Sequence, residues 1–112
     1  MIIQKYSTTD LIFNLAQYFD STVLTDIIAA EITFGTGVNQ VRKLWYAYDV
    51  HRSSATYNRT QKSLKVSLCN AETANWKYQI PIQIRVKNKA NKIDTSIVFY
   101  AYIQEALSTE DF

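Results

Sequence analysis

Apolar residues stand at every second position between residues 76 and 86, and this alternation limits the fold more than any other feature of the sequence. The series consists of Trp76, Tyr78, Ile80, Ile82, Ile84 and Val86. Because successive side chains of a strand point to opposite faces, a period of two predicts a long strand with one buried face. Shorter series with the same period lie in residues 43–50 and 63–69, and residues 95–103 are apolar on both parities. We expect strands in all three, with a hairpin turn at residues 88–91.

Pro81 lies in the middle of the longest series. Proline cannot donate a backbone hydrogen bond to a neighbouring strand, so it belongs on an edge or at a bulge. The alternation continues unchanged through Pro81, which disfavours a bulge. We therefore expect this strand to be paired on one side for only half its length, which leaves a free edge that could pair with another chain.

The N-terminal third is predicted to be helical. Hydroxyl residues at positions 7–9 can cap a helix, and apolar residues follow at helical spacing. They are Leu11, Ile12, Leu15, Tyr18 and Phe19, then Val23, Leu24, Ile27, Ile28 and Ile32 after a second cap at residues 20–22. Gly35 and Gly37 can end the second helix. Two short helices within residues 8–34 are favoured, and one kinked helix over residues 9–33 is the alternative.

These patterns together predict a single α+β domain over residues 1–112. Two N-terminal helices, residues 8–34, would pack on one face of a four-stranded antiparallel meander, residues 41–104. Ile2 and Ile3 predict a short extra N-terminal strand, and residues 105–112 form an acidic tail.

Basic residues are concentrated in the middle of the chain. Residues 41–92 hold eleven of the twelve lysines and arginines against two acidic residues, a net charge of +9. Residues 1–40 and 93–112 carry net charges of −3 and −4. A basic middle between acidic ends predicts an anionic partner for one surface, either nucleic acid or the acidic surface of another copy.

The face of the predicted sheet that points away from the helices combines basic and aromatic residues, whereas an exposed face should be evenly polar. The predicted contact consists of Trp45, Val98, Tyr100 and Tyr102, with Lys65, Lys77 and Arg85 around them. Three occupants fit this face: another segment of the same chain, a protein partner, or single-stranded nucleic acid stacked on the aromatic rings. A protein partner that includes a second copy is the favoured binding reading.

A polar loop is predicted over residues 51–61, longer than the usual hairpin connection. The residues in it that could grip an anion or insert into a neighbour are His51, Arg52, Tyr57 and Arg59. The tail, residues 105–112, is read as a frayed terminus, and a docking peptide with Phe112 as its anchor is the alternative.

Catalytic signals are few. His51, the one histidine, follows Asp49 and could act as a general base, and Cys69 could form a nucleophile pair with it. Both are better explained as ordinary surface residues. Metal-ligating residues are scattered, and the sequence holds no phosphate-binding or dinucleotide-binding motif. We therefore predict a protein without enzymatic activity, cofactor or metal.

The expected order of strand, helices and antiparallel strands resembles, in architecture alone, the small bacterial ribonuclease toxins of toxin–antitoxin pairs. A helix-plus-sheet domain with a long hairpin is also similar to the joining and terminating rings of phage tails. The leading functional prediction is an assembly or interaction protein in a homo-oligomer or larger complex, such as a phage-type ring. A single-stranded nucleic-acid-binding module is the alternative, and a toxin-like ribonuclease is third.

No apolar run of about eighteen residues and no signal peptide is evident, so no membrane partner is expected. The single cysteine fits a cytoplasmic protein or a virion component.

Overall fold

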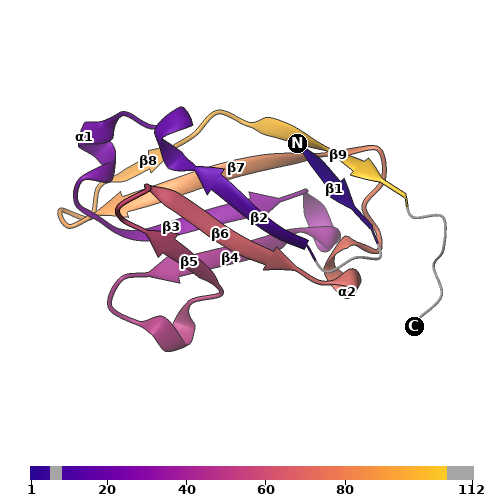
Figure 1. Cartoon of the computed structure of the whole chain (residues 1–112), viewed down its shortest axis with the longest axis horizontal. Helices are drawn as coiled ribbons and strands as arrows, with labels where there is room; N and C mark the ends of the chain where they lie inside the picture. Colours follow the sequence, from indigo (N-terminus) through magenta and orange to yellow (C-terminus); the bar gives the residue numbers. More distant parts are fainter. Residues whose placement is uncertain (6–8, 106–112) are drawn as a thin grey trace.

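The chain forms two packed β-sheets in the computed structural model, which describes residues 1–5 and 9–105 (Figure 1). In that part of the chain there are nine strands and only two helices, each of a single turn. The strands are β1 (Ile2–Gln4), β2 (Thr9–Asn14), β3 (Ile27–Phe34), β4 (Val41–Tyr46), β5 (Ala55–Asn58), β6 (Ser63–Leu68), β7 (Gln79–Asn88), β8 (Ile93–Thr95) and β9 (Phe99–Gln104). The helices are α1 (Ser21–Leu24) and α2 (Asn70–Thr73), and the 3₁₀ turns are η1 (Leu15–Gln17), η2 (Gly37–Asn39) and η3 (Val50–Arg52).

The larger sheet, sheet A, has the strand order β1-β9-β7-β3-β4, and β8 also pairs with β7. The smaller sheet, sheet B, has the order β2-β6-β5. The β1–β9 pair is parallel, and all other described pairs are antiparallel. None of the helices in the described residues is long and apolar enough to cross a membrane.

The core lies between the two sheets, because most strands turn a row of apolar residues toward the partner sheet. Phe13 of β2 contacts both Phe34 of β3 and Phe99 of β9, with ring centroids 6.1 and 6.2 Å apart. Trp76 stacks on Phe34 at 5.7 Å, and its indole Nε1–H donates to the carbonyl of Asn39 at 3.2 Å. Burying this apolar surface is the main term that holds the sheets together.

The predicted α+β class, two helices on a four-stranded meander, is wrong. The segments expected to form helices are mostly strands, and the strands expected to form one meander are divided between two sheets. In β2, Leu11 and Phe13 are buried and Ile12 is exposed, which is a period of two. In β3, Ala30, Ile32 and Phe34 follow the same rule. Short apolar runs fit both the period of a strand and the period of a helix. Pairing of β2 with β6, and of β3 with β4 and β7, decides between them. The predicted caps at residues 7 and 8 lie outside the described residues.

The face assigned to residues 43–50 is also wrong. Val41 and Trp45 of β4 pack against the core, whereas Leu44 and Tyr46 line a hollow on the opposite face of sheet A. Lys43 lies on the same side as Trp45 and pairs with Glu72 at 2.7 Å. A lysine on the inward side makes that side of β4 read as polar. Its charge is paired with Glu72, which lies far along the sequence and cannot be anticipated from residues 41–50.

Several strand predictions are confirmed. The alternation in residues 63–69 and 76–86 corresponds to β6 and β7, the turn at residues 88–91 joins β7 to β8, and the short N-terminal strand is β1. Tyr78 departs from its series: it is exposed, with a φ of 64° in the left-handed region just before β7.

Pro81 stands where the β3–β7 ladder ends. Its carbonyl accepts from the N–H of Gly35 at 2.8 Å, so its missing N–H faces the end of β3, where the loss costs least. However, β3 pairs with β7 from Ile82 to Asn88. Only Gln79–Pro81 extends beyond that ladder, so the free edge is much shorter than the predicted half of the strand.

Neighbouring residues of β2 offer a direct test of strand against helix. Phe13 is 1% exposed and Ile12 is 66% exposed, although helical spacing places Ile12 in the core. We expect Phe13→Ala to lower the free energy of unfolding by about 3–5 kcal/mol, because it leaves a cavity between the sheets. Ile12→Thr should change it by less than about 0.5 kcal/mol. Urea unfolding of both variants measures the difference, and a reversed order would contradict the strand assignment.

Candidate interaction surface

Because the inner faces are filled by the core, any binding chemistry must lie on the outer faces, edges and loops. The outer face of sheet B is small and polar, and its Asp10 accepts from Ser67 and pairs loosely with Lys65 at 4.0 Å. The outer face of sheet A is larger and carries three distinct features. They are a row of apolar and aromatic residues, an ion bridge and a hollow beside that bridge.

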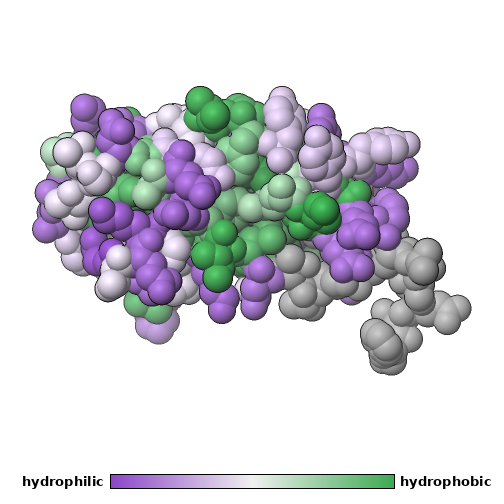
Figure 2. All heavy atoms as spheres, turned by 45° about the horizontal axis from the view of Figure 1, so that its top comes forward, coloured by the Kyte–Doolittle hydropathy of each residue, from purple (hydrophilic) through white to green (hydrophobic). Residues whose placement is uncertain are grey.

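The first feature, which we call the tyrosine stripe, lies on β1, on β9 and on the residue just before β9. It consists of Ile2, Val98, Tyr100 and Tyr102. Val98, Tyr100 and Tyr102 are two residues apart on the chain and share a face, and Ile2 is in register with Tyr102. Tyr100 and Tyr102 are 53% and 62% exposed. On the face of the molecule that Figure 2 shows, hydrophobic side chains gather near the middle, and hydrophilic ones lie toward both ends.

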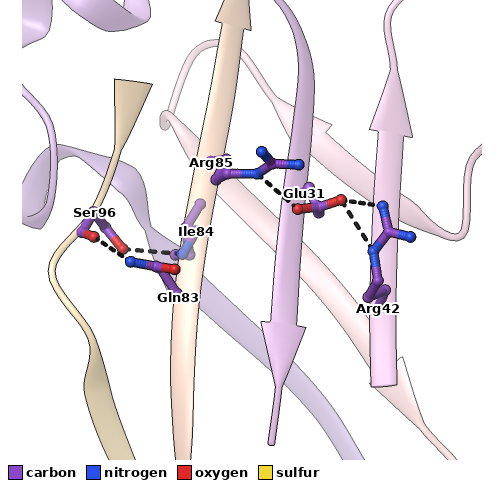
Figure 3. Close-up of polar contacts among 6 residues, drawn as sticks. All are labelled: Glu31, Arg42, Gln83, Ile84, Arg85 and Ser96. Carbon is purple, nitrogen blue, oxygen red and sulfur yellow. Dashed lines mark hydrogen bonds and ion pairs between the residues drawn. The ribbon is translucent and has the colours of Figure 1, made fainter. Parts of the chain in front are cut away.

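Buried Ser96 fixes the start of the stripe, between β8 and β9. Its Oγ accepts from the N–H of Ile84 at 2.9 Å, and its own N–H donates to the carbonyl of Ile84 at 2.8 Å. The carbonyl of Ser96 accepts from the side-chain amide of Gln83 at 3.0 Å (Figure 3). These bonds tie the chain just before Val98 to the centre of sheet A.

The second feature, the Arg–Glu–Arg bridge, crosses three adjacent strands. Glu31 of β3 lies between Arg85 of β7 and Arg42 of β4 (Figure 3). Arg85 Nε donates to Glu31 Oε1 at 2.9 Å, and Arg42 donates to Oε2 through Nε at 3.1 Å and through Nη2. Glu31 is only 9% exposed, whereas both arginine side chains remain about half exposed.

The electrostatics of the bridge favour an ionised Glu31. Burial alone would raise the pKa of this carboxyl. Hydrogen bonds from Arg85 and Arg42, with their positive charges, outweigh burial and hold the pKa below its usual value. One carboxylate therefore orients two guanidinium groups, and both arginine side chains remain about half exposed.

The third feature is a shallow hollow of about 220 Å³ that we call the Ala29 recess. Ala29 is in register with Tyr46 on one side and with Lys87 on the other. Its single methyl group leaves space between two long side chains. The rim consists of Glu31, Arg42, Leu44, Tyr46, Arg85, Lys87 and Ile93. The recess thus joins an apolar floor to three cations and one carboxylate.

The structure brings together only part of the contact predicted from the sequence. Val98, Tyr100, Tyr102 and Arg85 share the outer face of sheet A. Trp45 faces the core, where it contacts Tyr57 at 4.8 Å. Lys65 lies on β6 of the other sheet, and Lys77 lies ahead of β7. The sequence did not single out Glu31, Arg42 or Ala29.

The segment predicted as a polar loop contains η3 and β5. Tyr57 is buried, Arg59 lies 5.5 Å from the ring of Trp45, and Arg52 lies 4.7 Å from the ring of Tyr46. Arg59 also donates to the carbonyl of Ile27 at 3.2 Å. Three of the four loop candidates thus anchor this segment to the sandwich, whereas His51 is exposed and makes no such contact in the described structure.

No catalytic arrangement emerges from the described residues. No hydrogen bond there joins His51 to Asp49 or Cys69, and the Asp49 carboxylate instead accepts from the backbone of Arg52 at 3.2 Å. Cys69 is an exposed free thiol at the start of α2. Across residues 1–5 and 9–105, no group of His, Cys, Asp and Glu is placed to hold a metal ion.

Neither the known protein-family models nor the curated proteins contain a match to this sequence.

Acid should weaken the contribution of the bridge. Because folding lowers the pKa of the Glu31 carboxyl below its ordinary value of 4.5, the stability that the ionised carboxylate adds is fully present above about pH 4.5. That stability is lost as the pH falls through the lower pKa of the folded state. We expect Glu31→Gln to reduce the free energy of unfolding by about 2 kcal/mol at pH 7. The reduction should shrink in acid.

Urea unfolding of wild type and Glu31→Gln at several pH values measures this difference. Asp10→Asn, on the outer face of sheet B, is the matched control and should change stability little at any pH, since its ion pair is exposed. A Glu31→Gln effect of the same size at neutral and acid pH would show that the carboxylate charge is not involved.

Proposed function

We propose that this chain is a non-enzymatic assembly protein that binds further copies of itself through the outer face of sheet A. The tyrosine stripe carries the proposal, since it places four apolar or aromatic side chains in one exposed row. Interface cores are enriched in tyrosine. A tyrosine has few side-chain torsions to fix, so it contributes contact area at low entropic cost.

The two edges of sheet A differ, and the difference favours contact on the side of the stripe. At the β4 edge, the N–H groups of Leu44 and Tyr46 donate to the hydroxyls of Ser54 and Ser53, each at 2.9 Å. At the opposite edge, β1 pairs only with β9 in the described chain. An open edge strand can pair with another chain. This open edge lies directly beside the stripe.

Charge supports a second copy as the partner. The chain combines a basic middle with acidic ends, so two copies can present complementary charge without a third component. A contact between different surfaces of two copies closes into a ring or grows further, whereas a twofold contact closes as a dimer. The resemblances to toxins and phage rings rested on the helical layer and are not carried further.

Single-stranded nucleic acid remains the second candidate, with weaker support. A nucleic-acid platform needs cations next to its stacking rings. On β7, the neighbours of the stripe are glutamines rather than lysines, since Tyr102 is in register with Gln79 and Gln83 lies near Val98. Among the described residues, Arg42, Arg85 and Lys87 line the Ala29 recess, and of these three Arg85 alone also shares a hollow with Val98.

Removing the stripe should abolish self-association. We expect wild type to show a mass that rises with concentration in sedimentation equilibrium. Tyr100→Thr with Tyr102→Thr should remain monomeric over the same range, because the contact loses both aromatic rings and threonine keeps the strand propensity. Light scattering in the presence of a single-stranded oligonucleotide distinguishes the second candidate.

Ile12→Thr is the matched control, since it removes one large exposed apolar residue from the outer face of sheet B. It should self-associate like wild type. A wild-type chain that stays monomeric at high concentration would refute the proposal. If the double tyrosine variant still assembled, the tyrosine stripe would not be the contact between copies.

A further inference from the structure

We infer that the Ala29 recess binds the acidic–aromatic sequence Glu110-Asp111-Phe112 of a second copy. This inference rests on the proposed self-association and names the contact that would complement the stripe. Residues 106–112 lie outside the described part of the chain, so the inference uses only their sequence. The recess itself is described in full.

The chemistry of the recess fits two carboxylates followed by a phenyl ring. Arg42 uses Nε and Nη2 on Glu31, and Arg85 uses only Nε in the described structure. Arg42 Nη1 and both terminal nitrogens of Arg85 therefore remain for a second carboxylate, and Lys87 adds a third cation on the same rim. Guanidinium groups that are already oriented bind carboxylates with little loss of freedom.

The apolar part of the recess fits an aromatic ring. Leu44, Tyr46 and Ile93 form its walls, and Ala29 lies at its floor. Arg52 stacks on the ring of Tyr46 at 4.7 Å and so steadies one wall. The net charge of the rim is +2, from three cations and Glu31, which leaves an attraction for an acidic segment.

The length of the acidic segment favours the recess of a second copy over its own. β9 ends at Gln104, near the start of β7, because Tyr102 is in register with Gln79. Lys87, on the rim of the recess, lies eight residues further along β7 than Gln79, and so about 26 Å away. The seven residues from Glu105 to Asp111, six Cα–Cα steps, span at most about 22 Å when fully extended. An extended segment therefore falls short of Lys87 in its own molecule, which favours a contact between two molecules.

A peptide with the sequence of residues 105–112, labelled at its N-terminus, tests the recess against dilute full-length protein by fluorescence anisotropy. We expect binding that weakens with salt. Glu110→Lys with Asp111→Lys in the peptide should lower the affinity at least roughly tenfold, because attraction becomes repulsion. Ala29→Leu in the protein, which fills the recess without changing charge, should have an effect of similar size.

Ala90→Leu, in the exposed turn between β7 and β8, is the control and should bind like wild type. Thermal unfolding identifies any Ala29→Leu effect that comes from misfolding. Lys87→Glu then supplies a second variant, whose binding should return with the charge-reversed peptide.

Three results would overturn the inference: no binding of the wild-type peptide, equal binding to Ala29→Leu folded protein, or displacement by inorganic phosphate as readily as by unlabelled peptide. The last would indicate a site for small anions. Self-association through the stripe without peptide binding would refute the recess contact alone. Peptide binding by a chain that stays monomeric would refute the proposed assembly instead.

Discussion

The contact between the two inner faces is the constraint on which the rest of the structure depends. Phe13 of sheet B meets Phe34 and Phe99 of sheet A, and the apolar residues of nearly every strand surround this cluster. A sheet that buries one face completely leaves only the other for binding. The core thus determines which residues are free to contact a partner, and the larger outer face, on sheet A, offers most of them.

The sequence predicts the strands that have an unbroken alternation and fails where a second pattern fits equally well. β6 and β7 follow from a clear period of two. β2 and β3 could not be predicted in this way. Leu11, Leu15 and Phe19, in and after β2, also fit helical spacing, and so do the apolar residues of β3. Long-range pairing decides such segments, and nothing local reports it. Phe13 was the available signal: it belongs to the strand series with Leu11 and Leu15 but not to the helical one.

The candidate surface was predictable in part for the same reason. Tyr100 and Tyr102 lie on the predicted face because β9 keeps its alternation. Trp45 does not lie on the predicted face. It shares the inward side of β4 with Lys43, and the charge of Lys43 led that side to be assigned to solvent. Glu31 and Ala29 could not be recognised while residues 27–34 were read as helix. Once these residues form a strand, Ala29, Glu31 and Thr33 face outward, and the bridge and the recess follow from cross-strand register.

The polarity of charge along the chain has a simple structural counterpart. The cations on the outer face of sheet A come from β4 and β7, and they gather around one carboxylate. Arg85 also lines a hollow with Val98 of the tyrosine stripe. Apolar contact and ionic contact therefore adjoin each other on one face. A partner that engages both must present apolar and acidic side chains, and most of the acidic residues of this chain lie in residues 1–40 and 93–112.

The most direct test of this account is to dilute isotope-labelled protein and follow its backbone amide signals by NMR. The account predicts concentration-dependent shifts at Val98, Tyr100 and Tyr102, and around Ala29 and Lys87, while Ile12, Thr56 and Lys65 on sheet B stay unchanged. Shifts confined to the outer face of sheet B, or none at any concentration, would contradict it.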